Sequence, residues 1–273
     1  MARTLLPLIL FFFLTGAAPR YISLAPSTTE ILYALGLESE IAAVSSYCNY
    51  PPRAALKPKT GDFSHPNMET ILSRKPDYVF GTGLEQAPAI AELKRLKIKV
   101  YAADPANLNE LFVTISDIGK ITGREKEVLA IVSSMKKDIA AVRKKAGAIP
   151  QDKRAKVFVE IWHDPLMTAG KGSFVDELIY LAGGVNIAHE TPRPYCNYSA
   201  EKVVSADPDC IIMAYMDKEP PLKLAERRSG WANISALRNG RVYNDIDPDL
   251  LLRPGPRLTA GLKALYTKLY PEK

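Results

Sequence analysis

The sequence has 273 residues, 47% of them hydrophobic and 24% charged, with 36 Lys plus Arg against 30 Asp plus Glu. This composition excludes a disordered, collagen-like or coiled-coil chain, and the mixed charge lacks the basic stripe with interleaved aromatic residues that is typical of nucleic-acid binding. Three cysteines without a CxxC pair argue against a disulfide-dense scaffold and a structural zinc site.

The first element is an apolar segment at the N-terminus. Arg3 precedes an almost unbroken apolar run from Leu5 to Leu14, and the small residues 15–18 follow it. This order is typical of a secretory signal peptide, which we place at residues 1–18. The run is too short to cross a bilayer comfortably, and an uncleaved anchor is the alternative. No cysteine follows the run, which argues against a lipoprotein.

Residues 19–122 alternate between short apolar strands and helices, which predicts a parallel sheet covered by helices. The strands are expected at 21–24, 41–44, 78–80 and 98–101. One helix is expected after Ser27, because Ser27 and Glu30 fit a capping box. Another is expected to begin after Asn67 and to end near Ser73, before a Pro-Asp pair.

Residues 123–147 form the next predicted element, a long amphipathic helix. Its apolar residues recur at steps of three and four, and no proline interrupts it. The stripe consists of Val128, Ile131, Val132, Met135, Ile139 and Val142. A helix of this length is a stiff rod of about 30 Å, which we interpret as a connector between two halves; one more surface helix is the alternative.

Residues 148–273 repeat the pattern of the first half. Strands are expected at 157–161, 211–214 and 242–243, and helices at 173–182 and 199–205. Three matches occur in the same order in both halves: Glu30–Gly36 with Glu177–Gly183, Tyr47–Tyr50 with Tyr195–Tyr198, and Glu69–Asp77 with Glu201–Asp209. The matches predict two similar α/β lobes.

The candidate ligand-binding residues lie in loops after the predicted strands, where open α/β sheets bind ligands. Aromatic loop residues offer rigid apolar faces that suit a large flat ligand, although a lone loop tyrosine is more often only half-buried. These candidates are Tyr50, Phe63, Trp162 and Tyr195. His163 is the best single polar candidate. The three histidines lack metal-ligand spacing, so no metal site is expected.

The cysteines and two glutamates occupy matched places in the two halves. Cys48 and Cys196 are either independent thiols, a disulfide across a cleft, or a thiol pair near a metal. Cys210 begins an apolar strand and is expected to be buried and inert. Glu69 and Glu201 each follow a helix cap by two residues. There they either stabilise the helix dipole or bind basic residues of a two-fold symmetric partner.

Three segments now show a family resemblance. Ser23–Leu32, Ser45–Pro52 and Asn67–Asp77 resemble the vitamin B12 and ferric-siderophore periplasmic binding proteins, which are the substrate-binding subunits of ABC importers. The similarity covers about residues 20–269 and is strongest to the cobalamin-binding branch. It implies an α/β fold of two Rossmann-like lobes with central, mostly parallel sheets. One long rigid α-helix would join the lobes, and the ligand would lie in the cleft.

The resemblance also implies roles for individual residues. One glutamate per lobe is expected to pair with arginines of the permease dimer, which maps onto Glu69 and Glu201. Aromatic ligand contacts map onto Tyr50, Phe63 and Tyr195, and less directly onto the Trp162 position. Phe63 and Tyr195 stand where tryptophans are expected in the cobalamin proteins, so the chain departs from that branch at two contacts.

Together these observations predict a non-catalytic, monomeric periplasmic protein that captures a corrinoid, cobalamin foremost, and needs no cofactor. His163 and Arg253 are expected to contact the ligand's polar edge. A ferric-siderophore or haem carrier of the same build is the alternative. It would need a cluster of cleft arginines, for which Arg193, Arg253 and Arg257 are the nearby candidates. A metal-chelatase-like or oxidoreductase-like enzyme is the alternative of another class, against which the missing acid–base set argues.

Overall fold

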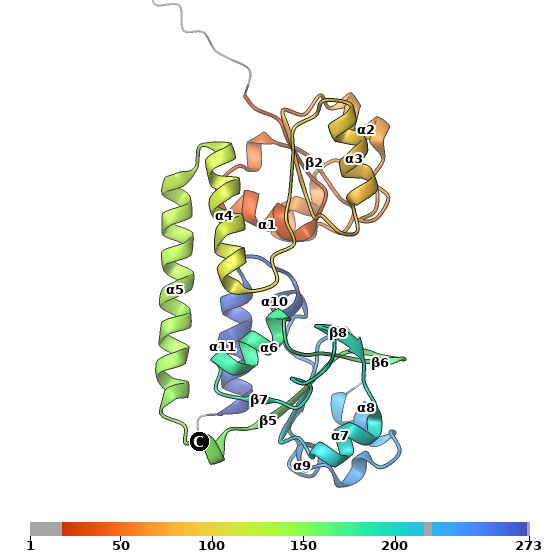
Figure 1. Cartoon of the computed structure of the whole chain (residues 1–273), viewed down its shortest axis with the longest axis vertical. Helices are drawn as coiled ribbons and strands as arrows, with labels where there is room; N and C mark the ends of the chain where they lie inside the picture. Colours follow the sequence, from red (N-terminus) through yellow and green to blue (C-terminus); the bar gives the residue numbers. More distant parts are fainter. Residues whose placement is uncertain (1–17, 216–219, 272–273) are drawn as a thin grey trace, which may run out of the picture.

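The computed structural model describes residues 18–215 and 220–271. The predicted signal peptide therefore lies, up to residue 17, outside the described residues. Two lobes, each with its own sheet, lie one above the other in Figure 1, and one long helix runs beside both. Within the described ranges, no helix has the length and apolar character needed to cross a membrane.

The first lobe contains a four-stranded parallel sheet in the order β2-β1-β3-β4. Its strands are β1 (Tyr21–Ser23), β2 (Ile41–Val44), β3 (Tyr78–Gly81) and β4 (Val100–Ala102). Its helices are α1 (Pro26–Ala34), α2 (Met68–Ser73), α3 (Ala87–Arg95) and α4 (Leu108–Thr122), and short 3-10 turns cover Glu38–Glu40 and Pro52–Leu56. The predicted strands and the helix capped by Asn67 are confirmed to within two residues.

Alternation along these strands divides the core of the first lobe into two layers. Tyr21 and Phe80 pack in the cluster that contains α1 and α4, whereas Ile22 and Val79 pack against Ile71 of α2. Successive side chains of a strand point to opposite faces, so a short apolar strand buries both. Figure 1 shows α2 and α3 on one side of this lobe, and α1 and α4 on the other.

The second lobe repeats the parallel arrangement and adds an antiparallel extension. Its parallel strands follow the order β7-β5-β9-β10, while β6 and β8 pair antiparallel beyond β5. The strands are β5 (Lys156–His163), β6 (Leu166–Ala169), β7 (Val185–Asn186), β8 (Tyr195–Asn197), β9 (Cys210–Met213) and β10 (Val242–Tyr243). Strands β7-β5-β9-β10 therefore correspond to β2-β1-β3-β4, as the sequence repeat predicts.

The helices of the second lobe surround this sheet. They are α6 (Phe174–Leu181), α7 (Ala200–Ala206), α8 (Pro221–Glu226), α9 (Ser235–Arg238), α10 (Asp249–Leu252) and α11 (Leu258–Leu269), with 3-10 turns at Gln151–Lys153 and Trp231–Asn233. Helices α1 and α6 match each other as predicted. Each ends before a glycine in the left-handed region, Gly36 at φ 76° and Gly183 at φ 78°.

Helix α5 (Glu125–Gly147) connects the lobes as predicted. Its 23 residues correspond to a length of about 34 Å. It packs against α4 of the first lobe and against α6 and α11 of the second. The predicted stripe faces the protein, with Val128, Met135 and Val142 buried. One hydrophobic cluster consequently extends from Tyr21 in the first lobe to Leu269 in the second.

Two local expectations are wrong. The tetrapeptide Tyr47–Tyr50 forms a turn and loop after β2, whereas its copy at Tyr195 lies in strand β8 and its ladder. The same four residues adopt different structures because β8 pairs with β6, and the first lobe has no such partner strand. Sequence identity over four residues is overridden here by tertiary pairing.

The expected capping box at Ser27 and Glu30 is the second error. Helix α1 begins at Pro26 with Ala25 at the N-cap position and no side-chain cap. Proline favours the first helical position, so the helix starts earlier than the serine predicts. Glu30 is thereby placed more than a turn inside the helix, too far to reach the N-cap amide, and its carboxylate binds two arginines instead.

Candidate functional site

A cavity of about 460 Å³ lies between the two lobes and is called the inter-lobe cavity here. From the first lobe it is lined by Ser27, Thr82, Glu85, Ala103, Asp104 and Pro105. From the second lobe it is lined by Ile161, Phe174, Tyr195, Leu252 and Pro254. Several of these residues lie at or just beyond the carboxyl ends of β3, β4 and β5, the place where the sequence predicts ligand binding. Its size is within the range of small-molecule sites.

The charged side chains that line this cavity are acidic. Of the described residues in its wall, Glu85 and Asp104 carry charge and none is basic. The Asp104 carboxylate accepts hydrogen bonds of 2.9 Å from the backbone N–H groups of Gly83 and Leu84, which fixes it in the wall. Leu84 itself is 82% exposed. An acidic and apolar wall suits a neutral or cationic ligand.

Strands β5, β6 and β8 place two predicted contacts on the same face. Trp162 pairs with Met167, and Ala169 pairs with Tyr195. Residues paired across an antiparallel ladder share a face, as do residues two apart along one strand. Trp162 and Tyr195 therefore point to the same side. Their side chains are 47% and 41% exposed, which leaves aromatic surface available to a ligand.

His163 lies on the opposite face of this sheet. It pairs with Leu166, which is out of phase with Met167. With Leu166, it lines a separate groove of about 640 Å³ that also contains Glu201 and Arg228. Although its ring contacts the neighbouring Trp162, with centroids 5.1 Å apart, the structure groups His163 with α7 rather than with Tyr195.

Phe63 is half-buried at the strand ends of the first lobe. Its backbone carbonyl accepts a 2.9 Å hydrogen bond from the amide nitrogen of Gln86. The same amide nitrogen binds the Leu24 carbonyl at 2.8 Å, and the Gln86 oxygen accepts from Thr82 N–H at 3.0 Å. The fully buried Gln86 thus ties the Phe63 loop to the ends of β1 and β3, beside Thr82 of the inter-lobe cavity.

Tyr50 lies apart from the inter-lobe cavity. The guanidinium of Arg257 covers its ring at 3.7 Å, a cation–π contact. Both residues line a smaller cavity of about 270 Å³ between α1 and the loop that precedes α11. The structure therefore brings Tyr50 together with Arg257, not with Trp162 or Tyr195.

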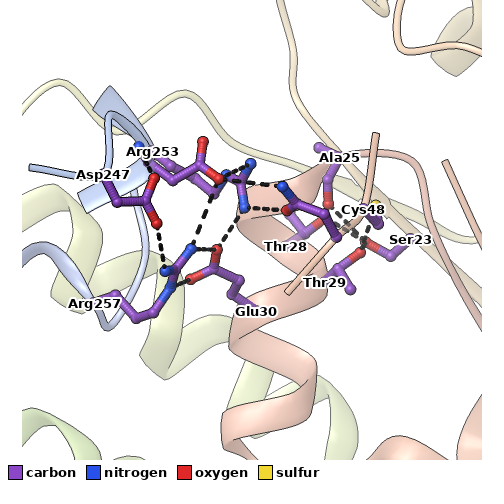
Figure 2. Close-up of polar contacts among 11 residues, drawn as sticks. Ser23, Ala25, Thr28, Thr29, Glu30, Cys48, Asp247, Arg253 and Arg257 are labelled. Carbon is purple, nitrogen blue, oxygen red and sulfur yellow. Dashed lines mark hydrogen bonds and ion pairs between the residues drawn. The ribbon is translucent and has the colours of Figure 1, made fainter. Parts of the chain in front are cut away.

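Arg253 belongs to a buried ion cluster that joins the lobes (Figure 2). Its Nη1 donates to Glu30 Oε1 at 2.7 Å, and its Nη2 lies 2.7 Å from Asp249. Arg257 donates to the two Glu30 oxygens at 2.8 Å and 2.6 Å. Hydrogen bonding to Glu30 raises the pKa of Arg257. Both guanidinium charges are therefore compensated by carboxylates, and Glu30 of the first lobe is bound to the second.

Glu69 and Glu201 occupy the same position on matched helices. Asn67 and Ser199 cap α2 and α7, and each glutamate is the second residue of its helix. Both are exposed. Glu69 makes no hydrogen bond or ion pair with the described part of the chain. The Glu201 carboxylate accepts from the Ser199 hydroxyl, which lowers its pKa.

The cysteines are free and buried, so the structure has no disulfide between Cys48 and Cys196. Thr29 donates its hydroxyl to the Cys48 sulfur at 3.1 Å, and burial raises the pKa of this thiol. Cys196 alternates with Tyr195 along β8 and so faces away from the inter-lobe cavity. Cys210 is fully buried in β9, where burial raises its pKa to about 12. Across the described ranges, no group of His, Cys, Asp or Glu is arranged to hold a metal ion.

Sequence reasoning missed Asp104, Tyr215 and Glu160. Asp104 and Tyr215 each follow a strand by two residues, so the rule that ligands bind at strand ends points to both positions. Glu160 lies inside an apolar strand and is fully buried. A lone carboxylate in such a strand is itself a signal, because a buried charge requires a partner.

Comparisons with known proteins agree with this architecture. The sequence profile of the periplasmic binding protein family matches residues 22–249. An uncharacterized ABC transporter substrate-binding lipoprotein, YvrC of Bacillus subtilis, is 35% identical over 93% of this chain and 80% of its own length.

Two solved structures illustrate the range of the relatives. The periplasmic vitamin B12-binding protein BtuF of Vibrio cholerae is 27% identical, with a TM-score of 0.78 over 92% of this chain and 96% of its own. The periplasmic heme-binding protein RhuT of Roseiflexus sp. RS-1 is also 27% identical, with a TM-score of 0.81 over 93% and 98%. The chain therefore belongs to the periplasmic binding protein family, as a two-lobed substrate-binding protein of the kind that serves ABC transporters.

Proposed function

We propose that the chain captures a corrinoid, cobalamin foremost, in the inter-lobe cavity and delivers it to the permease dimer of an ABC importer. The observation that carries the choice of ligand is the wall of the cavity, which combines the acidic Glu85 and Asp104 with Tyr195 and contains no basic side chain among the described residues. A corrin ring offers a broad apolar face and peripheral amide N–H groups, and it carries no excess of negative charge. Aromatic faces and carboxylate acceptors are complementary to such a ligand.

The haem or ferric-siderophore alternative fits this wall less well. Anionic chelates are bound by arginine clusters, and Arg253 and Arg257 are already paired with Glu30, Asp249 and Asp247. Burial also raises the pKa of the Tyr195 phenol, which works against the phenolate that ferric iron prefers. The similarity to a heme-binding protein keeps haem as the second candidate to be tested.

Trp162 and Tyr195 are the ligand contacts that the shared sheet face supports best. Phe63 at the strand ends of the first lobe is proposed to meet the opposite side of the ligand. Of the predicted contacts, Tyr195 lines the cavity itself, and Trp162 and Phe63 lie outside the described wall. The proposed contacts at Tyr50, His163 and Arg253 stay predictions and are secondary, because Tyr50 and Arg253 belong to the contacts around Arg257 and Glu30, and His163 lies on the other face of the sheet.

Delivery is proposed to use the exposed pair Glu69 and Glu201, which would bind arginines of the permease. We further propose that the chain is exported to the periplasm as a monomer and that its N-terminal segment is removed near residue 18. The proteins of this family bind substrates and do not transform them, so no catalytic step is proposed.

Calorimetric titration of the purified chain with cyanocobalamin, cobinamide, haem and a ferric hydroxamate tests the ligand. Binding of both corrinoids, and of neither iron compound, is the expected result. Tight binding of haem or the hydroxamate without binding of either corrinoid would overturn the proposal. Recovery of chemically unchanged ligand would separate a carrier from an enzyme.

Two variants sharpen this experiment. Replacing Tyr195 by alanine is expected to weaken corrinoid binding about tenfold or more, while the matched control Tyr180→Ala, at a 68% exposed position of α6, leaves it unchanged. Glu85→Arg places a positive charge in the wall and is expected to shift the preference towards haem. An unchanged preference would remove the charge argument.

A further inference from the structure

A buried carboxylate lies directly behind the aromatic contact proposed for the second lobe. Glu160 is 0% exposed and precedes Trp162 by two residues on β5, where the pairing with β6 shifts by one residue. A buried carboxylate is unfavourable unless it is paired and hydrogen-bonded. The partners of Glu160 must therefore account for a charge at this position.

Glu160 is bound from two sides. Arg228 donates from both terminal nitrogens to the two carboxylate oxygens, with Nη2 at 2.5 Å from Oε1. The Tyr215 hydroxyl donates to the same Oε1 at 2.5 Å. Arg228 is itself held against the Trp231 ring, 4.5 Å from its centroid, and Trp231 is fully buried. The carboxylate thus fixes the Tyr215 ring with little freedom to rotate.

The Tyr215 ring in turn contacts the exposed end of β5. Its centroid lies 6.3 Å from the Trp162 ring in an edge-on arrangement, and 5.5 Å from the His163 ring. Trp162 is further held by a 2.9 Å hydrogen bond from its indole N–H to the Asp164 carbonyl. These contacts hold the indole, which remains half-exposed at the tip of a strand pair.

We propose that Glu160, Arg228 and Tyr215 are positioning residues that fix the indole plane of Trp162 for the ligand. Together they are called the Glu160 network. This inference rests on the proposed function. It adds three residues that lie outside the wall of the cavity and hold a proposed ligand contact in place. A well-packed apolar core would stabilise the lobe at least as well as a buried ion pair does, so stability alone does not account for the network. Preorganised aromatic contacts bind with a smaller loss of side-chain entropy.

The test uses Tyr215→Phe, which removes one hydroxyl and keeps the ring. The chain has two tryptophans, so a Trp231→Phe background makes Trp162 the sole indole. In the ligand-free protein, Tyr215→Phe is expected to lower the fluorescence anisotropy of Trp162 and to raise its acrylamide quenching. The Kd for cyanocobalamin is expected to rise about fivefold to tenfold, because a hydrogen bond to a charged group is lost.

Controls separate positioning from stability. Tyr180→Phe, on the exposed face of α6, should change neither fluorescence nor Kd. Arg228→Met should lower the anisotropy of Trp162 and raise the Kd, as Tyr215→Phe does. Arg228→Lys, which keeps one charged donor to Glu160, should reverse part of both changes. Circular dichroism confirms that each variant is folded.

Unchanged anisotropy and quenching in Tyr215→Phe, with only a lower thermal midpoint, would reduce the Glu160 network to a structural role and overturn the inference. Failure of the wild-type chain to bind cyanocobalamin, cobinamide, haem or hydroxamate would instead overturn the proposed function. The fluorescence of the ligand-free protein would still decide the positioning role in that case.

Discussion

The two lobes share a parallel sheet but support their strand ends in different ways. In the first lobe an uncharged amide, Gln86, binds the ends of β1 and β3 and the Phe63 loop. In the second lobe a charged pair, Glu160 and Arg228, takes this place, and Glu160 binds Tyr215 just after the end of β9. The first lobe contributes carboxylates to the inter-lobe cavity and the second contributes a tyrosine. Two copies of the same sheet can therefore present chemically different side chains to the cavity.

Helices α2 and α7 carry Glu69 and Glu201 at matched positions, and reversing these two charges has the largest expected effect if they bind the permease as proposed. Glu69→Arg combined with Glu201→Arg should abolish ligand uptake, because like charges would then face the permease arginines. Corrinoid affinity should be unchanged. Uptake of labelled cobalamin into vesicles that contain the importer measures the first quantity, and calorimetry measures the second.

The matched control for the double variant is Glu125→Arg, at an exposed glutamate in the first turn of α5. It should leave uptake at the wild-type level. An equal loss of corrinoid affinity in the double variant would contradict the docking role and place the glutamates at the ligand.

The ion cluster at Glu30 binds the lobes to each other, and its removal tests how far they are independent. Glu30→Gln leaves two guanidinium groups without their shared carboxylate and is expected to lower the free energy of unfolding by about 3 kcal/mol. Urea denaturation measures this change in the free energy of unfolding. Glu38→Gln, which breaks only the exposed pair with Arg53, should cost less than about 1 kcal/mol. Equal losses in both variants would show that the cluster is no stronger than a surface pair.

The helix caps offer a finer comparison of the lobes. Asn67→Ala and Ser199→Ala each remove a side chain that accepts from the helix backbone, at 2.8 Å in α2 and 3.4 Å in α7. Each is expected to cost about 1 kcal/mol, and the shorter bond at Asn67 predicts the larger loss. Thermal unfolding of the two variants measures the difference. A larger loss for Ser199→Ala would reverse the ranking that the distances predict.

The smallest expected effect concerns the pH dependence of the contact between α4 and α6. Glu177 accepts a 2.9 Å hydrogen bond from Leu108 N–H, and burial raises the pKa of its carboxyl. A raised pKa in the folded state means that stability is gained as the pH falls below neutral and is lost as it rises again. Subtracting the stability of Glu177→Gln from that of the wild type at pH 5 and pH 7 should isolate this gain, which is expected to be smaller than the loss in either helix-cap variant. A difference of opposite sign would show that the hydrogen bond outweighs burial.

The sequence was sufficient for the fold because the elements carry strong local signals. The stripe from Val128 to Val142 defines α5, and Asn67 and Ser199 define the starts of their helices. The same signals place Glu69 and Glu201 at matched positions of their helices. Periodicity and capping depend on neighbours within a few residues, so one chain contains all the information needed.

The site could be predicted only in part, because its geometry depends on pairing between distant strands. The register of β5 with β6 decides that Trp162 and Tyr195 share a face while His163 lies on the other. Nothing near His163 in the sequence specifies that register. Arg257 covers Tyr50 across the lobes, and Arg253 binds Glu30, which is more than 200 residues from it along the chain.

The hydrophobic cluster that passes through α5 without interruption has a consequence for how the protein melts. Because Tyr21 and Leu269 belong to the same cluster, neither half retains a complete core once the other is lost. Heating should therefore give a single calorimetric transition whose van't Hoff and calorimetric enthalpies agree, despite the internal duplication of the chain. Either half expressed by itself should be an aggregation-prone fragment and not an independently folded lobe.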